Sequence, residues 1–311
     1  MILFERVNLR KSSFVILNLF QNLNIFTTDK ENLELPKCRD RFTGTPDMNL
    51  TQQRFSGFQN TPFLWENDLH GIEQFRFDSH SLTIQKRIDD TIRLGNYVER
   101  LVSFELSNNP SIEILKENAQ IISNRLTLGE IDCILLQNDH PIHLEIAYKF
   151  YLYDPSVGNT FLEHWIGPNR RDSLVLKLNK IREKQFPLLY SKECRELLKE
   201  LNINIEKIEQ QSYVKAQLFV SYQSHIDFPE LNQECVVGYY INSLELKLFK
   251  DCKFYIPKKL DWLIQPHPQV DWINLEQTTT RIQEFHQRKS APLCWIKYPN
   301  GEISKLFVVW W

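Results

Sequence analysis

The sequence predicts an α+β fold with an α/β core. Residues 129–152 contain two apolar, strand-like runs around a short turn, and residues 82–108 carry apolar side chains close to helical spacing. The last third of the chain has the β-branched and aromatic runs that are typical of strands. With 311 residues and 42% hydrophobic content, the chain can bury a substantial core, as one large domain or two small ones.

The first 47 residues differ from the rest of the chain. Basic residues precede an apolar run at 13–20, as in a signal peptide, but polar residues interrupt the run and no small-residue cleavage site follows. The run is also too short to span a membrane. The polar composition continues to residue 60 and is typical of poor order. We therefore expect residues 1–60 to be a poorly ordered or spurious extension, with Met48 as the true start.

Residues 82–108 are expected to form a helix with one apolar stripe. Glu99 lies seven residues after Ile92 and therefore near the inner face. Glu99 either contributes its carboxylate to a functional site or lies at the edge of the apolar stripe, where it reaches water or pairs with an arginine. The stripe consists of Ile84, Ile88, Ile92, Val98 and Val102.

A hairpin is expected next, with strands at Asp132–Leu136 and His143–Lys149. The residues between them, Gln137–His140, have turn chemistry. A hairpin that closes around residues 138 and 139 places Asp132 opposite Glu145. Like charges directly opposed in a sheet are destabilising, and a divalent cation between them removes that cost. Hard ions such as Mg²⁺ and Mn²⁺ choose carboxylate ligands, so the pair is a candidate metal site.

Strand alternation adds a lysine to this pair. Side chains at every second position share a face, so Glu145 and Lys149 point the same way as His143 and Ala147. A half-buried strand with its polar face in water explains the same alternation. The nearby Asp132 favours a site.

Several short stretches of the sequence resemble those of known protein families. The pattern G-E-x-D, followed by a strand with E-x-x-x-K, resembles the core of the PD-(D/E)XK nuclease superfamily. From about Met48 onward, the chain is similar to an uncharacterised bacterial family catalogued as domain of unknown function 1853, which is grouped with those nucleases. The stretches are RLGNYVERL (93–101), GEIDCILL (129–136), HLEIAYKFYL (143–152), HWIGPNRRDSLVLKLNKI (164–181) and VKAQLFVSY (214–222).

The resemblance implies a restriction-endonuclease-like mixed sheet flanked by helices. We expect residues 61–205 to form this core and residues 206–311 to form a strand-rich region packed on it. It also implies Mg²⁺- or Mn²⁺-dependent phosphodiester hydrolysis, with Asp132, Glu145 and Glu99 as metal ligands. Lys149 would act with Asp132 and Glu145 in catalysis, by stabilising the developing charge or orienting the attacking water.

One departure from the superfamily pattern concerns the lysine. The usual Glu-x-Lys is replaced here, because Ala147 stands two residues after Glu145 and the lysine is Lys149. On a strand this shift moves the lysine backbone ~7 Å further from the ligands, a distance that its long side chain can cover. The interpretation of this chain as a degenerate relative that keeps the nuclease fold without cleaving nucleic acid therefore also stays open.

A basic helix is expected after the hairpin, with Asp172 as its N-cap and Leu174, Leu178 and Ile181 buried. Lysine and arginine beside a carboxylate site suit a phosphate backbone, so DNA or RNA is the expected partner. A solvated helix face explains the same charges, and the net charge of −2 gives no global basic field. The candidate nucleic-acid-binding residues are Arg170, Arg171, Lys177, Lys180 and Lys184.

Two weaker signals follow in the chain. Gln185 with Tyr190 resembles the Gln-Tyr pair of RecB-type nucleases, although the spacing is one residue too long. Strands are expected at 213–222, 235–248 and 293–310, the last with a turn at Asn300-Gly301.

The six cysteines are scattered without a C-x-x-C pair, which argues against zinc and against a disulfide-linked partner. We expect a cytoplasmic protein that does not enter a membrane.

Three function classes remain open from the sequence. The first is a metal-dependent nuclease, and the second is a catalytically degenerate module that binds nucleic acid without cleaving it. The third is a structural or protein-interaction domain in which Asp132, Glu145 and Lys149 form a buried ion network.

Overall fold

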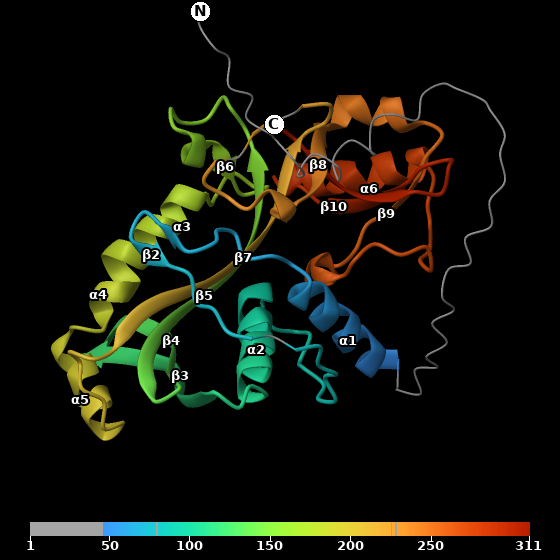
Figure 1. Cartoon of the computed structure of the whole chain (residues 1–311). Coiled ribbons are helices and arrows are strands. Elements are labelled where there is room, and N and C mark those ends of the chain that lie inside the picture. The colour runs from blue at the N-terminus through green and yellow to red at the C-terminus, as the bar shows by residue number, and fades with distance from the viewer. Residues whose placement is uncertain (1–45, 79, 225, 228) are drawn as a thin grey trace, which may run out of the picture. The chain divides into compact units, whose positions relative to one another are not determined.

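The computed structural model describes residues 46–311 except 79, 225 and 228 (Figure 1). One large mixed sheet organises these residues, in the strand order β3-β4-β5-β7-β8-β11-β10-β9, with the short β6 paired to β5. The mixed α+β class predicted from the sequence is confirmed. The strands are β3 (Ile112–Ser123), β4 (Leu126–Gln137), β5 (His140–Tyr153), β6 (Trp165–Ile166), β7 (Glu209–Ser221), β8 (Val236–Asn242), β9 (Lys253–Tyr255), β10 (Leu293–Lys297) and β11 (Ile303–Val309).

The sheet continues across the predicted division at residue 205. Strand β5 pairs in parallel with β7 from Ile142↔Glu209 to Leu152↔Phe219, and β7 pairs in parallel with β8. The strands on either side of the division therefore share one hydrogen-bonded sheet.

The predicted hairpin forms between β4 and β5. Asn138 and Asp139 both have positive φ, 49° and 65°, which is the conformation of a tight two-residue hairpin turn. Cys133 pairs with Leu144, so the register is the one that sets Asp132 opposite Glu145.

The two strands diverge at this point. The pairing of β4 with β5 ends at Cys133↔Leu144, and beyond it β4 pairs with β3 while β5 pairs with β7. Strand alternation also breaks at Asp132, because Cys133 packs in the cluster that includes helix α2 and Ile131 packs in the cluster that includes helix α5. Asp132 and Glu145 thus lie at the start of a gap between strands.

Helix α1 (Pro46–Gln59) corrects the expectation of poor order up to residue 60. Phe55 and Phe58 are fully buried in the main core, and Arg54 forms a buried ion pair with Asp261 at 2.6 Å. These contacts supply the burial that orders the segment despite its polar composition. The part of the expectation that concerns residues 1–45 lies outside the described residues.

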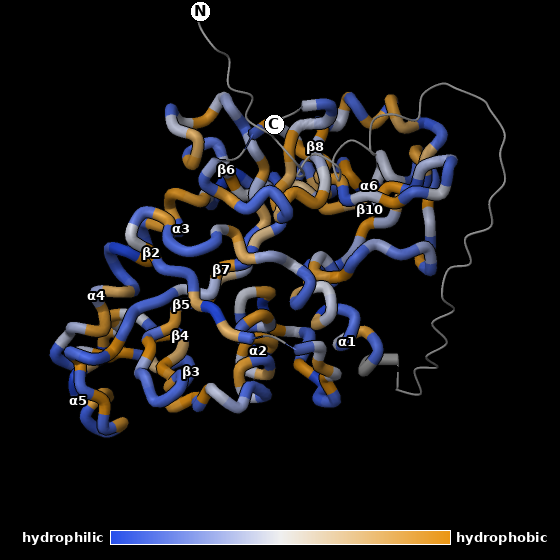
Figure 2. Tube along the Cα trace, in the orientation of Figure 1, coloured by the Kyte–Doolittle hydropathy of each residue, from blue (hydrophilic) through white to orange (hydrophobic). Residues whose placement is uncertain are grey.

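Helix α2 (Leu94–Ser107) is shorter than the helix predicted over 82–108. The preceding segment instead runs along α1, where the Ile84 amide donates to Gln52 Oε1 at 2.8 Å. Tyr97, Val98, Leu101 and Val102 of α2 are buried against β4 and β5. In Figure 2, hydrophobic segments recur along α2 and the neighbouring strands, with hydrophilic ones between them.

A second group of helices follows β6. Helix α3 (Leu174–Lys180) continues into the π-helical turn η3 (Ile181–Gln185) and α4 (Phe186–Leu188), and α5 is Lys192–Glu200. The N-cap of α3 is Ser173 rather than the predicted Asp172, since Ser173 Oγ accepts from the Leu176 amide at 3.2 Å. The predicted buried stripe of Leu174, Leu178 and Ile181 is confirmed.

The remaining elements complete the C-terminal part. The predicted strand 235–248 is strand only in β8, because a capping box at Asn242 and Glu245 starts the 3-10 helix η5 (Ser243–Phe249). Helix α6 (Leu275–Gln287) was not predicted. Elsewhere lie β1 (Asp68–Leu69), β2 (Ile72–Glu73), η2 (Phe161–His164), η4 (Gln233–Cys235) and η6 (Lys259–Leu263).

None of the helices in the described part of the chain is long and apolar enough to cross a membrane. The described cysteines, at positions 133, 194, 235, 252 and 294, are buried free thiols.

Candidate carboxylate site between strands β4 and β5

The pairing of β4 with β5 (Figure 1) ends at Cys133↔Leu144, and Asp132 and Glu145 are the next residues on the two strands. Asp132 is half-buried, and its Oδ2 accepts a hydrogen bond from the Ile146 amide at 2.9 Å. Glu145 is fully buried. Because the two strands separate here, the Ile146 amide is not paired with β4 and donates to the side chain of Asp132 instead.

Burial dominates the electrostatics of this pair. It raises the pKa of Asp132 to about 7, with the nearby Glu145 as the second cause, and it raises the pKa of Glu145 to about 7 against the opposing effect of Lys177. A side-chain hydrogen bond links the two carboxyl groups, so near neutral pH they are favoured to share a proton. A bound cation would reduce the repulsion between the two carboxylates in the same way as a shared proton does.

Two uncharged donors hold the carboxylate of Glu145. Gln185 donates from Nε2 to Glu145 Oε2, and its own Oε1 accepts from Lys177 Nζ at 3.1 Å. His143 Nε2 lies 3.0 Å from Glu145 Oε1. Both carboxylate oxygens of Glu145 therefore have an uncharged partner, in addition to the interaction with Asp132.

The tautomer of His143 follows from its other neighbour. Gln210 Nε2 lies 2.9 Å from His143 Nδ1 and 2.7 Å from the Phe186 carbonyl oxygen. An amide nitrogen can only donate, so Nδ1 of the imidazole accepts and the proton is on Nε2. Burial lowers the pKa of His143 to about 4, which keeps the ring neutral. His143 thus donates to Glu145 as a neutral imidazole.

The lysine beside the carboxylates comes from α3. Lys149 Nζ lies 2.6 Å from Asp172 Oδ2, in a pair that is partly exposed. Lys177 instead reaches Gln185, and its pKa is lowered by burial while Glu145 and Asp132 oppose the change. The structure therefore brings Lys177 to the carboxylates and pairs Lys149 with Asp172.

Glu99 lies on α2, near Asp132. Burial raises the pKa of Glu99, and Asp132 and Glu130 raise it further. These causes place Glu99 in the electrostatic field of the site. However, the described residues contain no group of three or more His, Cys, Asp or Glu side chains arranged to hold a metal ion.

The donor chemistry fits a hard divalent cation held by two carboxylates. Mg²⁺ keeps several of its waters and is commonly bound through one or two carboxylates together with substrate phosphate. Asp132 and Glu145 supply such a pair, and burial raises the pKa of both carboxyl groups.

Comparison with known families identifies the chain. A family model described as "Domain of unknown function (DUF1853)" matches residues 46–309. The chain belongs to this family. No curated protein and no solved structure gives a significant match.

The basic residues of this DUF1853 chain divide into two groups. Arg170 forms an ion pair with Asp154, and its guanidinium lies 4.0 Å from the centre of the Trp311 ring, so it is committed to internal contacts. Lys177 faces the carboxylates. Exposed and available to a partner are Arg171, Lys180 and Lys184.

Two residues of the candidate carboxylate site had weak or no signals in the sequence. Gln185 was singled out only through its resemblance to a Gln-Tyr pair, and Tyr190 is 51% exposed. Gln185 closes the π-helical turn η3, and such turns are frequent at functional sites. No pattern in the sequence pointed to Gln210, because it lies beside His143 only through the non-local parallel pairing of β5 with β7.

Proposed function

We propose that this protein is a Mg²⁺- or Mn²⁺-dependent phosphodiesterase that acts on nucleic acid. The observation that carries the proposal is the pair of carboxyl groups at the gap between β4 and β5, with Lys177 beside them. Burying Asp132 and Glu145 together is costly for the fold, and strongly shifted pKa values cluster at functional sites. Binding of a cation and a phosphate at this site would explain why the fold tolerates this cost.

Each residue has a role in the proposal. Asp132 and Glu145 would hold the cation, which would polarise the phosphate and lower the pKa of a bound water. His143 and Gln185 fix the orientation of Glu145. Lys177 takes the role that the family resemblance implied for Lys149, stabilising negative charge on the phosphate.

The substrate backbone would follow the exposed face of α3 and η3. Lys180 and Lys184 are exposed there, beside the Lys177 position. Lysines on such a face gain by displacing counterions from the phosphates. Arg171 precedes the helix and would extend the same contact.

The test is cleavage of end-labelled single-stranded DNA, duplex DNA and RNA by the full chain. We expect cleavage with Mg²⁺ or Mn²⁺ that stops with a chelator and in Asp132→Asn and Glu145→Gln. Glu113→Gln, which changes an exposed carboxylate on β3, serves as the matched control and should retain activity. Equal turnover in Asp132→Asn and the unmodified chain would refute the proposal.

A second candidate is a module that binds nucleic acid without cleaving it. It is favoured by the pairing of Lys149 with Asp172, which turns the strand lysine toward Asp172. It predicts salt-sensitive binding with no metal-dependent turnover on any of the three substrates.

A further inference from the structure

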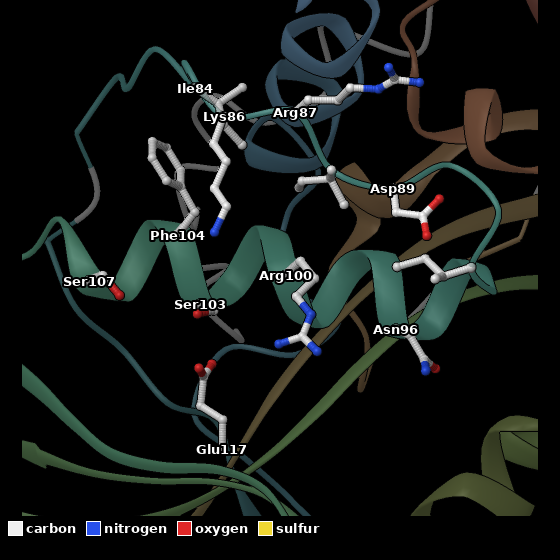
Figure 3. A pocket seen from close by; sticks show the side chains of 12 residues that line it. Ile84, Lys86, Arg87, Asp89, Asn96, Arg100, Ser103, Phe104, Ser107 and Glu117 are labelled. Carbon is white, nitrogen blue, oxygen red and sulfur yellow. The ribbon is translucent and has the colours of Figure 1, made fainter.

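A cavity of about 600 Å³ lies between helix α2 and the segment 84–92 (Figure 3). This volume is in the range of small-molecule sites. Glu117 of β3 lines the side nearest the sheet. The cavity is separate from the contacts that hold Glu145.

One wall of the cavity is apolar. It consists of Ile84, Ile88, Ile92 and the ring of Phe104. Ile84 is buried and its amide is bound by Gln52 of α1, so the segment that forms this wall is anchored before any ligand arrives. A flat apolar ligand group would find a preformed surface here.

Cations face the same space. In Figure 3 the ammonium of Lys86 extends from the segment 84–92 toward α2, and the guanidinium of Arg100 points from α2 toward the carboxylate of Glu117. Within the described residues, neither makes a hydrogen bond or a close ion pair. The nearby Asp89 carboxylate is already bound by the amide and hydroxyl of Thr91, at 2.9 and 2.8 Å. Lys86 is therefore available to an anion, and Arg100 adds a second positive charge beside Glu117 and Glu99.

The cavity lies next to the carboxylate site. Asn96, Arg100 and Ser103 of α2 line it, and Glu99, which interacts electrostatically with Asp132, is adjacent to Arg100 on the same helix. On the sheet side, Glu117 pairs with Cys133, the residue after Asp132. Helix α2 and the β3–β4 pair therefore each carry neighbouring residues of the cavity and of the carboxylate site.

We propose that this cavity binds one nucleotide of the substrate, next to the phosphate at the carboxylate site. Lys86 and Arg100 bind its phosphate, and the base lies against Phe104 and the isoleucines, because base stacking on an apolar surface tolerates any base. Asn96 and Ser103 supply hydrogen bonds to the sugar or the base edge. The inference rests on the proposed function, since it assigns the neighbouring nucleotide of that substrate.

The test measures binding of adenosine monophosphate to the full chain by calorimetry and by NMR chemical-shift changes, without divalent cations. We expect Lys86→Gln/Arg100→Gln to weaken binding by about tenfold or more, because each charge-assisted contact to phosphate is lost. Lys116→Gln/Arg125→Gln, which removes the same two side-chain types from exposed positions on the β3–β4 hairpin, should bind as the unmodified chain does.

Binding of adenosine alone and of inorganic phosphate alone tests the apolar wall and the cationic residues of the cavity separately. Adenosine and inorganic phosphate should each bind more weakly than adenosine monophosphate, because each fills only half of the cavity. Equal affinity of the two double variants, or phosphate binding as tight as the nucleotide, would overturn the inference. Binding that persists in Asp132→Asn supports a nucleotide site distinct from the carboxylates. Metal-dependent cleavage without nucleotide binding would leave the proposed function standing and remove only this site.

Discussion

Gln185 and Glu145 are joined by a hydrogen bond in which the Gln185 amide donates to Glu145 Oε2, while Lys177 donates to the other end of the same amide. Gln185 comes from the end of a π-helical turn and Glu145 from the middle of a buried strand. The bond therefore couples the helix layer to the strand that carries the carboxylate, and it helps to fix the orientation of that carboxylate.

We expect Gln185→Leu to weaken Mn²⁺ affinity and cleavage by about 10–100-fold, because outer partners of metal ligands have effects of this size. Leucine keeps the buried volume, so the fold should persist. Calorimetric Mn²⁺ titration and initial cleavage rates are the measurements. Gln120→Leu, at an exposed position on β3, is the control. Unchanged Mn²⁺ affinity in Gln185→Leu would show that the bond does not position the ligand.

The roles of Lys177 and Lys149 can be separated directly. We expect Lys177→Gln to reduce turnover by about 10²–10³-fold, since it removes charge stabilisation at the phosphate. Lys149→Gln should lose less than about tenfold, because its partly exposed pair with Asp172 is screened by water. Single-turnover rates at saturating Mg²⁺ provide the comparison. The opposite order of effects would restore Lys149 to the role implied by the sequence resemblance.

The core hairpin could be predicted because its signals are local. Asn138-Asp139 sets the turn, the turn sets the register, and the register brings Asp132 and Glu145 together. The position of Lys177 could not be predicted in this way. It depends on how α3 and η3 rotate over the sheet, and that rotation follows from tertiary packing rather than from residue spacing.

Helix α1 and the continuous sheet were missed for related reasons. The buried Arg54–Asp261 pair joins residues that are 207 positions apart in the chain, and no local pattern reveals such a contact. The parallel pairing of β5 with β7 is likewise non-local, so the boundary expected at residue 205 was placed inside one sheet.

The carboxylate pair predicts a stability change that separates function from structure. The pKa of Asp132 rises from 3.8 to about 7 on folding, so its contribution is favourable below pH 4 and is lost as the pH rises to 7. Asp132→Asn should therefore stabilise the protein by about 1–3 kcal/mol at pH 8 and change little at pH 4.

Urea unfolding at the two pH values, without divalent cations, is the measurement for Asp132→Asn. Adding Mg²⁺ should stabilise the unmodified chain at pH 8 but not the variant. A structural ion network predicts the reverse, a loss of stability in Asp132→Asn at pH 8, because a buried partner is left unpaired.

Lys305 predicts a second pH dependence, far from the carboxylates. Its buried ammonium donates to Gln217 Oε1 at 2.7 Å and to the Trp262 carbonyl oxygen at 3.2 Å, and burial lowers its pKa from 10.5 to about 7. Between pH 7 and 10.5 the unfolded chain holds the proton that the folded chain has released. Stability contributed by Lys305 therefore rises with pH across this window.

We expect the Lys305→Met variant to lack this rise, which amounts to about 2–3 kcal/mol between pH 7 and 9.5. Unfolding by urea at several pH values gives the slope. Lys253→Met, at an exposed position on β9, should keep the slope of the unmodified chain. The same pH dependence in Lys305→Met and Lys253→Met would mean that Lys305 keeps its proton in the folded state.

The exposed lysines of α3 and η3 predict how nucleic-acid binding responds to salt. If Lys180 and Lys184 each neutralise one phosphate, Lys180→Gln/Lys184→Gln should lower the slope of log affinity against log salt concentration by about 2. The loss should be similar for different base sequences, because these side chains lie where they would meet the backbone. Fluorescence anisotropy in Ca²⁺, in place of Mg²⁺, over a salt series measures the slope. Arg170→Gln should leave the slope unchanged and lower stability instead, since Arg170 is held by Asp154 and Trp311. A slope that responds to Arg170→Gln but not to the lysine pair would place the nucleic acid on a different surface.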